Sequence, residues 1–357
     1  MNQKINSNAP PVPESLVEVR RGSIIESRHR GYVVAVGGDG RVITQLGERG
    51  LVTYLRSSAK PFQALPLITS GAAKRFNFTD EEVALACGSH SGEHVHVETV
   101  AGMLKKIGLD ETWLKSGTHE PFSREVAREL REGRESPTVL QNNCSGKHTG
   151  MLALALHLGA PPETYDQADN PVQIEIAKTI AHFADVAVED IAVGVDGCGV
   201  PVFGITMSQM ALMYARLVAP PSDFDLEVRR ACALIVRAMT EHPEIVGGTT
   251  ERLDTELMRT AKGGIVSKVG AEGVYTAGVL PCERWPQGFG LALKIEDGED
   301  RRARPTVVIE SLRQLGVLHD EMLEQLAPYA TFAVENHRGE KVGEIKAVFN
   351  LKMGDNS

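Results

Sequence analysis

The chain has 357 residues, which is enough for one large α/β unit or for two domains of roughly 150 residues each. It contains 38 Lys and Arg against 47 Asp and Glu, and the resulting net charge of −9 argues against broad nucleic-acid binding. Hydrophobic residues make up 42% and charged residues 24%, a composition typical of a globular protein and not of a disordered one.

No apolar run in the sequence reaches the length of a membrane span, so we predict no membrane insertion. The polar, proline-containing segment 1–16 lacks the apolar stretch of a signal peptide, and we therefore expect a cytoplasmic protein. An odd number of cysteines in such a chain favours reduced thiols over disulfides. The five cysteines are Cys87, Cys144, Cys198, Cys232 and Cys282.

The first part of the chain is predicted to be a flexible arm (1–14) followed by strands. Strands are expected at 16–19, 32–36, 41–44 and 51–55, and the Gly-rich segment 37–40 predicts a hairpin. Thr79 with Glu82 three residues later forms a capping-box pattern that predicts a helix start. Helices are predicted at 80–87, 94–107, 123–133, 146–158, 170–184, 207–217 and 222–241.

The apolar segment 191–195 predicts a buried strand that runs into a Gly-rich bend at 197–199. Further strands are expected within 263–280, 288–295 and 343–349, with helices at 303–315 and 319–328. Strands at both ends and helices between them predict an α+β fold in which the two ends share one sheet. We expect residues 15–56 and 250–357 to form the sheet-containing part, and residues 57–249 a helix-rich part.

Ser57 and Lys60 form the clearest chemical motif, S-x-x-K, at the start of a predicted helix. They lie one helical turn apart, so both can face one pocket. A serine hydroxyl needs a neighbouring base to become a nucleophile, and a neutral lysine can be that base. Neutrality near pH 7 requires the lysine pKa to fall by roughly three units, through burial or a second cation. The alternative is a helix-capping serine and a surface lysine.

Lys268 begins a second motif, Lys268-Val269-Gly270, in a strand-like stretch. It partly matches the K-[ST]-G strand that accompanies S-x-x-K in penicillin-binding proteins and β-lactamases, with Val269 replacing Ser or Thr. A second lysine in the pocket would lower the pKa of Lys60 and bind a substrate carboxylate. The alternative is a surface lysine on an edge strand.

The segment 87–94 contains His90, Glu93 and His94 in the H-x-x-E-H spacing of inverted zinc proteases. Two histidines four residues apart on a helix bind zinc, with the glutamate as base. However, Gly88 and Gly92 interrupt the helix that this geometry needs. We therefore prefer a Gly-flanked turn that exposes Ser89.

Cys144 and Cys198 both lie in Gly-rich turns, and two thiolates with a nearby nitrogen would suit zinc. The alternative is two buried free thiols. Asn142 precedes this first turn and is expected to orient a substrate amide. Asp196 precedes the second, where it is expected to bind a substrate amino group or to cap a turn.

Together these motifs resemble the rhizobial-type L-asparaginases, the thermolabile class 3 or asparaginase II family. The resemblance extends from about residue 15 to the C-terminus and combines five blocks in order. The blocks are Arg56-Ser57-Ser58-Ala59-Lys60-Pro61, Ala86-Cys87-Gly88-Ser89-His90-Ser91-Gly92-Glu93, Asn142-Asn143-Cys144-Ser145-Gly146-Lys147-His148, Asp196-Gly197-Cys198-Gly199 and Lys268-Val269-Gly270-Ala271-Glu272-Gly273.

The resemblance implies hydrolysis of L-asparagine to L-aspartate and ammonia. It implies an antiparallel-sheet fold similar to serine β-lactamases, penicillin-binding proteins and glutaminases, and a homodimer. It also implies two Ser–Lys pairs, Ser57 with Lys60 and Ser89 with Lys268. A zinc ion that supports substrate binding more than chemistry would be held by Cys144, Lys147 and Cys198.

On this basis we expect Ser57 to attack the side-chain amide with Lys60 as base, while Ser89 and Lys268 relay protons. The expected substrate-binding residues are Arg56, Asn142 and Asp196. One alternative is a related serine hydrolase, either a glutaminase or a penicillin-recognising enzyme; Val269 and the absence of a signal peptide oppose the latter. Another alternative is a non-catalytic zinc-binding protein with the same fold.

Overall fold

The structure, a computed structural model, describes residues 12–354. Most of the predicted arm therefore lies outside the described residues, and its last residue, Glu14, already begins strand β1. No helix among residues 12–354 combines the length and the apolar character that crossing a membrane requires.

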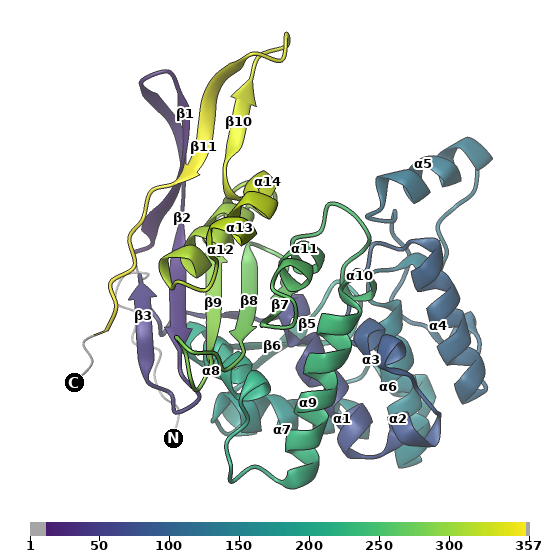
Figure 1. The fold of residues 1–357 in the computed structure, drawn as a ribbon. Helices are drawn as coiled ribbons and strands as arrows, with labels where there is room; N and C mark the ends of the chain where they lie inside the picture. The colour runs from purple at the N-terminus through teal and green to yellow at the C-terminus, as the bar shows by residue number, and fades with distance from the viewer. Residues whose placement is uncertain (1–11, 355–357) are drawn as a thin grey trace.

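The main sheet has eight strands taken from both ends of the chain (Figure 1). Its strands are β1 (Glu14–Arg21), β2 (Ile24–Val36), β3 (Val42–Leu46), β7 (Ile265–Val269), β8 (Val274–Val279), β9 (Phe289–Ile295), β10 (Phe332–Glu335) and β11 (Lys341–Ala347). The order is β10-β11-β1-β2-β9-β8-β7, β3 pairs with β2, and every pair is antiparallel. The predicted α+β class, with an antiparallel sheet from both ends and a helix-rich middle, is confirmed.

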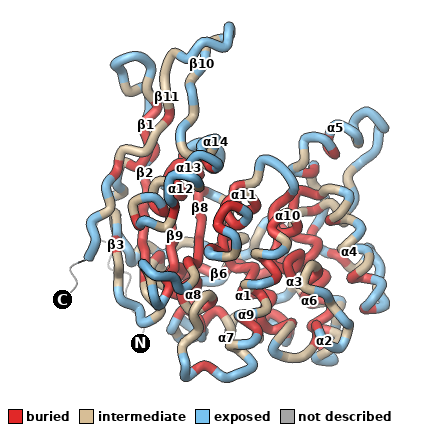
Figure 2. Tube along the Cα trace, viewed as in Figure 1, coloured by how far each residue is buried: buried red, intermediate tan, exposed pale blue. Residues whose placement is uncertain are grey.

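Both faces of this sheet are buried along β2, because alternate residues of a strand point to opposite sides. Val34 and Val36 join the core shared with the central helices, whereas Val33 and Ala35 join the core under the C-terminal helices. Figure 2 shows the buried positions running along β2, β8 and β9. The main sheet is thus the wall between two cores.

Helix α8 (Met207–Val218) covers the first of these faces at very close range. A Cβ at Gly290 of β9 would lie 1.8 Å from the carbonyl oxygen of Ala211 in α8, so only glycine fits there. The opposite face is covered by α12 (Ala303–Gln314), α13 (Asp320–Gln325) and α14 (Ala327–Ala330). The prediction of one helix at 319–328 is wrong: α13 ends at Gln325 and α14 begins at Ala327, with Pro328 in its first turn, where the missing N–H of proline is tolerated.

The remaining helices fall within residues 57–249, the predicted helix-rich part, except α11, which lies just after it. They are α1 (Lys60–Thr69), α2 (Ala72–Arg75), α3 (Asp80–Ala86), α4 (His94–Ile107), α5 (Arg124–Gly133), α6 (Ser145–Leu158), α7 (Pro171–Ala184), α9 (Leu226–Glu241), α10 (Pro243–Val246) and α11 (Leu253–Thr260). The predicted capping box of Thr79 and Glu82 is present at the start of α3. The predicted hairpin at 37–40 is also present, with Gly40 at a φ of +83° and its N–H bonded to the Gly37 carbonyl.

A second, three-stranded sheet with the order β4-β6-β5 was not predicted. Its strands are β4 (Val52–Tyr54), β5 (Ala192–Val195) and β6 (Pro201–Thr206). The prediction that 191–195 is buried is wrong: the residues Val193 and Val195 are 55% and 79% exposed. An apolar run suggests burial on both faces, but β5 is a short edge strand paired with β6. Because β4 and β5 lead directly into residues 56 and 196, this sheet positions two predicted site residues. The proposed boundaries between the two parts of the chain stay a prediction.

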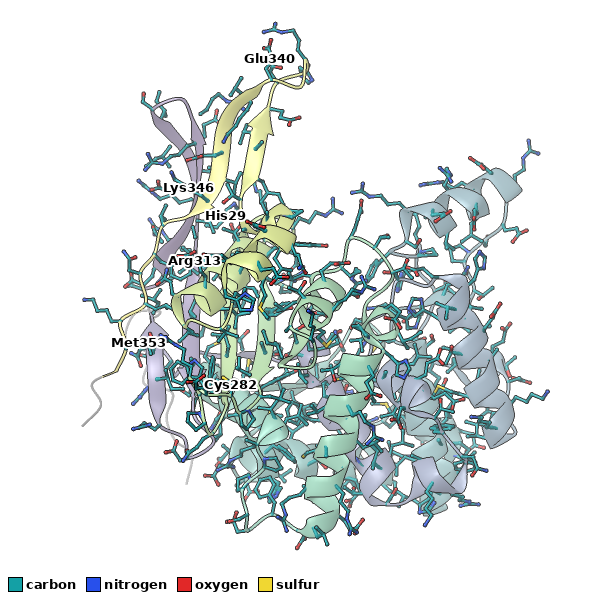
Figure 3. The ribbon with its side chains drawn as sticks, in the orientation of Figure 1. His29, Cys282, Arg313, Glu340, Lys346 and Met353 are labelled. Atoms are coloured by element: carbon teal, nitrogen blue, oxygen red, sulfur yellow. The ribbon has the colours of Figure 1, made fainter. Side chains whose placement is uncertain are left out.

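The hairpins β1–β2 and β10–β11 extend beyond the helices, with Glu340 at the far turn (Figure 3). Within this extension the buried Glu18 accepts hydrogen bonds from Arg20 at 2.6 Å and from Arg28 at 3.1 Å. This carboxylate belongs to β1, which lies four strands away from β7 in the sheet. Glu18 is therefore a buried carboxylate with two exposed arginine partners, remote from any residue placed on β7.

Candidate active site

Lys60 is the centre of the predicted site, and the structure buries it where three segments meet. The residue is 1% exposed at the start of α1, directly after the 3₁₀ turn η1 (Arg56–Ala59). Its Nζ lies 2.6 Å from Gly88 O, 2.9 Å from Ser89 Oγ and 3.1 Å from Asn143 O. The turn after α3 and the turn before α6 therefore converge on this amine.

Lys60 bonds to Ser89 here, whereas the resemblance implied pairs of Ser57 with Lys60 and of Ser89 with Lys268. Ser57 lies in η1 and is partly exposed. The neighbouring Ser58 is fully buried, and its hydroxyl donates to Leu55 O at 2.6 Å. Ser57 is thus the hydroxyl of this turn that faces a more open environment.

The three oxygen neighbours of Lys60 can accept from a protonated amine, and they can also accommodate a neutral one. Burial lowers the pKa of Lys60, and the Lys147 ammonium lowers it further, against the opposing effect of the Cys144 thiol. A neutral amine has two N–H groups and one lone pair. The carbonyls of Gly88 and Asn143 can take the two N–H groups, which leaves the lone pair to accept the Ser89 hydroxyl proton. In its neutral form, Lys60 would therefore be a base with the Ser89 hydroxyl within hydrogen-bond distance.

Both backbone groups of Ser89, its N–H and its carbonyl, are hydrogen-bonded. Its N–H donates to Val246 O at 2.8 Å, and its carbonyl accepts from Arg252 Nη2 at 2.7 Å. A Cβ at Gly88 would lie 3.0 to 3.1 Å from three carbonyl oxygens, so the approach of this turn to its neighbours favours glycine. At 2% exposure, Ser89 is much less accessible than Ser57.

Lys268 lies on β7, the last strand of the sheet, yet it is fully buried. The alternative of a surface lysine on an edge strand is therefore excluded. Its Nζ lies 3.4 Å from Asp254 Oδ2 and donates to Val269 O at 3.2 Å. Burial lowers the pKa of Lys268 to about 7, with Lys60 and Arg252 acting in the same direction and Asp254 opposing them. A lysine that titrates near neutrality is suited to proton transfer.

Two of the five free thiols, those of Cys144 and Cys198, form a buried cluster with Lys147. Lys147 Nζ lies 3.0 Å from Cys198 Sγ. The neighbouring Cys198 thiol lowers the pKa of Cys144 well below its usual value despite burial, and the charges of Lys60 and Lys147 add to this effect. The structure thus brings together two sulfurs and one nitrogen, which are donor types that zinc prefers.

Arg56 and Asp196 form an ion pair at the ends of β4 and β5, with Arg56 Nε 2.8 Å from Asp196 Oδ1. The two strands thus position opposite charges side by side. Arg56 also has a φ of +51°, a conformation that is uncommon for a residue with a side chain and recurs at functional sites.

The side chain of Asn142 is hydrogen-bonded to backbone groups of the protein. The amide donates to the carbonyls of Ser116 and Gly117, each at 3.0 Å, and its oxygen accepts from the N–H of Cys144 at 2.8 Å. These three bonds fix the turn that presents Cys144 and the carbonyl of Asn143.

The inverted zinc-protease pattern is not formed. His90 is buried, with Nε2 2.9 Å from Ser145 Oγ, whereas the side chain of His94 is 77% exposed beside Glu129. The two histidines therefore do not share a metal. Across residues 12–354 there is no group of three or more His, Cys, Asp or Glu that could hold a metal ion; the thiol cluster has a lysine as its third member.

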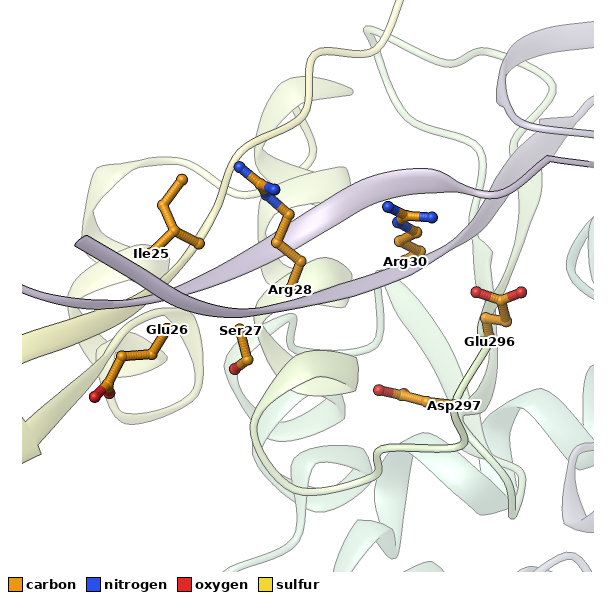
Figure 4. A pocket seen from close by; sticks show the side chains of 7 residues that line it. All are labelled: Ile25, Glu26, Ser27, Arg28, Arg30, Glu296 and Asp297. Carbon is orange, nitrogen blue, oxygen red and sulfur yellow. The ribbon is translucent and has the colours of Figure 1, made fainter.

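Sequence reasoning missed Arg252 and Asp254, which contact Ser89 and Lys268 respectively. An acidic residue in the first turn of a helix is common, so nothing in the sequence distinguished Asp254. A cavity of about 500 Å³ is lined in part by Phe122, Thr249 and Arg252. A cavity of about 430 Å³ lies far from the site, on β2 beside residues 296–297 (Figure 4).

Gly146 lets α6 approach α3 behind the site, and this contact gives a testable prediction. A Cβ at Gly146 would lie 2.6 Å from both the side chain and the carbonyl oxygen of Leu85. We expect Gly146→Ala to destabilise the protein by about 1–3 kcal/mol in chemical denaturation, because overpacking forces backbone shifts. The matched control is Gly102→Ala, at a helical position with nothing within 4 Å, which should be neutral or stabilising. Equal effects of both substitutions would contradict the close contact.

Known proteins similar to this chain are found by a family model and among solved structures. A family model described as L-asparaginase II matches residues 17–347. No curated protein matches the chain. Among solved structures, a probable glutaminase from Bacillus subtilis complexed with 6-diazo-5-oxo-L-norleucine is 13% identical with a TM-score of 0.37, covering 80% of this chain and 84% of that one. A Bacillus glutaminase in 4.3 M NaCl is 14% identical (TM-score 0.35, coverage 80% and 91%), and Mglu in its native form is 14% identical (TM-score 0.43, coverage 81% and 65%).

Proposed function

The chain belongs to the L-asparaginase II family and is an amidohydrolase, and we propose that it converts L-asparagine to L-aspartate and ammonia. The observation that carries the proposal is the contact between the buried Lys60 amine and the Ser89 hydroxyl. Lys60 lies one helical turn after Ser57, which is partly exposed. This arrangement supplies a hydroxyl nucleophile, a base and a relay, which hydrolysis of an amide through an ester intermediate requires.

In the proposed mechanism Ser57 is the nucleophile, since it is the more accessible of the two serines. Its Oγ forms a bond to the carboxamide carbon of the substrate, while its proton passes through the Ser89 hydroxyl to Lys60. Lys60 then returns the proton to the leaving nitrogen as the C–N bond breaks, and ammonia departs. Water attacks the resulting aspartyl ester by the same route and releases L-aspartate and free Ser57.

Lys268 contributes a second, titratable amine behind this pair. Lys60 lowers the pKa of Lys268, because two nearby positive charges disfavour each other, and Lys268 can replace a proton lost from the relay. Arg56 and Asp196 would bind the α-carboxylate and the α-ammonium of the substrate. Asn142 would act indirectly, through the turn that carries Asn143 and Cys144.

Zinc is part of the proposal, and the thiol cluster fits it chemically. Cys144, Lys147 and Cys198 would hold the ion, since the pKa of Cys144 already favours a thiolate. When bound, zinc supplies positive charge and a fixed coordination geometry next to Asp196, which supports substrate binding. Lys147 must lose a proton to be a ligand, so we expect zinc affinity to rise with pH.

We expect Cys144→Ser and Cys198→Ser to lower zinc content strongly and to raise KM more than they lower kcat, because the ion supports binding. Cys282→Ser is the control, since that thiol is exposed and is not part of the cluster (Figure 3). Zinc per chain is measured by elemental analysis after gel filtration. Wild-type zinc content in the Cys144→Ser protein, or loss of zinc in His90→Ala alone, would overturn this ligand set.

A homodimer and a cytoplasmic location remain proposals as well. The exposed apolar side chains of Val193 and Val195 on β5 support a subunit contact near Asp196. All five cysteines are free thiols, which supports a reducing compartment. Light scattering on the purified protein tests the dimer directly; a monomeric mass at all concentrations would contradict it.

The substrate assignment is tested by incubating the purified protein with L-asparagine, L-glutamine and a chromogenic β-lactam in parallel. We expect ammonia from L-asparagine, weaker release from L-glutamine and no β-lactam hydrolysis. One extra methylene is worth about 1–3 kcal/mol in a fitted pocket, which is a factor of roughly 10–200 in kcat/KM. A preference for L-glutamine would identify a glutaminase, and inactivity towards all three would favour a non-catalytic zinc-binding protein.

A further inference from the structure

Asp254 and Lys268 form an ion pair that is exceptional in its burial. Asp254 lies in the first turn of α11, and its Oδ2 is 3.4 Å from Lys268 Nζ. The two side chains are 1% and 0% exposed, the deepest burial on both sides among the ion pairs of residues 12–354. The same carboxylate oxygen accepts the N–H of Val269 at 3.0 Å, so it is fixed to the strand that carries the lysine.

Burying two charges costs more free energy than their attraction usually returns, so such a pair is weak evidence of a stabilising role. Its position indicates another purpose. Two residues earlier, Arg252 donates to Ser89 O at 2.7 Å and to Ser91 Oγ at 3.0 Å. One short turn, residues 252–254, therefore holds both the Ser89 backbone and the Lys268 amine.

We propose that Asp254 is a positioning residue for the reaction: its carboxylate anchors the Lys268 amine in the site and supplies the negative charge that faces it. This proposal rests on the proposed function, in which Lys268 supports the relay of Ser89 and Lys60. Asp254 contacts neither the substrate nor Ser57; it acts through Lys268.

The charges around Lys268 explain why one carboxylate is decisive. The facing groups are Asp254 from α11, Lys60 from α1, Arg252 before α11 and Cys87 after α3. Burial raises the pKa of Cys87 to about 12, so this thiol is neutral at pH 7. Asp254 is therefore the single anion in this set, and it faces Arg252 and, when protonated, Lys60.

The tyrosines that face Asp254 do not change this balance. Tyr214 from α8 and Tyr275 from β8 have pKa values raised well above the usual range by burial, so both are neutral. Without the Asp254 charge, the remaining cations and burial would push the pKa of Lys268 down. Its protonated form would then be lost at lower pH.

The test is the pH dependence of kcat/KM between about pH 5 and 9 for wild type and Asp254→Asn, with the better amide substrate. Asparagine keeps an acceptor for the Val269 N–H but carries no charge. In wild type we expect kcat/KM to fall near pH 7 as Lys268 loses its proton, and we call this fall the limb of the profile. In Asp254→Asn we expect the limb to move to lower pH by about one unit or more, because an adjacent opposite charge shifts a pKa by about 1–3 units. A lower rate with an unshifted limb would overturn the proposal.

Glu18→Gln is the matched control, since it neutralises another buried, ion-paired carboxylate on a remote strand. Its profile should coincide with that of wild type. An equal shift in Glu18→Gln would show that general destabilisation moves the limb and would also overturn the proposal.

A second comparison works even if Asp254→Asn folds poorly. Lys268→Gln leaves Asp254 as a lone buried charge, which is strongly destabilising, whereas Lys268→Gln with Asp254→Asn removes both charges. We expect the double variant to have the higher unfolding temperature. If Lys268→Gln alone is as stable as the double variant, the pair is not coupled and the proposal fails. Absence of ammonia release by wild type would instead overturn the proposed function, and the unfolding comparison would still apply.

Discussion

Replacement of Lys60 by methionine should reduce ammonia release from L-asparagine by about 10³–10⁴-fold. The substitution removes the base and the group that aligns the Ser89 hydroxyl, while methionine keeps most of the buried volume. Because it takes a potential charge out of a fully buried position, we expect the unfolding temperature to stay the same or rise. The effect is read from kcat/KM and from a thermal melt of the same preparation.

Lys294→Met is the matched control for Lys60→Met. Lys294 is a partly buried lysine on β9 whose Nζ donates to Glu272 O at 2.7 Å, away from the site. Its loss should leave the rate per folded molecule close to that of wild type. If Lys60→Met retained more than about one tenth of the wild-type rate, Lys60 would not be the base.

The second large effect is expected at the two serines of the relay. Ser57→Ala removes the proposed nucleophile and should lower kcat by about 10⁴-fold or more. Ser89→Ala removes the relay and should lower it by about 10²–10⁴-fold, since a water molecule can take the place of the hydroxyl. Rates of ammonia release, measured with L-asparagine in large excess, give both values.

Ser58→Ala controls for loss of a hydroxyl in the same turn. The Ser58 hydroxyl donates to Leu55 O and is fully buried, so its removal should cost about 1 kcal/mol of stability and leave the rate nearly unchanged. A Ser57→Ala variant that is as active as Ser58→Ala would exclude Ser57 as the nucleophile.

Local sequence patterns were sufficient for most elements of the fold. The capping box of Thr79 and Glu82 and the hairpin at 37–40 depend on neighbouring residues, and both are present. The exposure of Val193 and Val195 could not be predicted in this way. Whether an apolar strand lies in the middle or at the edge of a sheet is decided by tertiary structure.

The same distinction applies to the candidate site. The S-x-x-K spacing places Ser57 and Lys60 on one turn, but it does not say where the lysine amine points. That direction is set by the carbonyls of Gly88 and Asn143, which belong to segments 28 and 83 residues away. Asp254 carries no motif, since its role comes from contact with a strand 14 residues later.

The central claim is an ester intermediate on Ser57, and trapping it is the most direct test. The protein is mixed with L-asparagine, quenched in acid during steady turnover and digested with an acid protease. Mass spectrometry of the peptides that carry Ser57 and Ser89 then locates any aspartyl group. We predict an aspartyl adduct on Ser57 in the wild type and in Lys268→Gln, and none in Ser57→Ala. An adduct on Ser89, or turnover with no adduct on either serine under conditions that slow deacylation, would contradict this account.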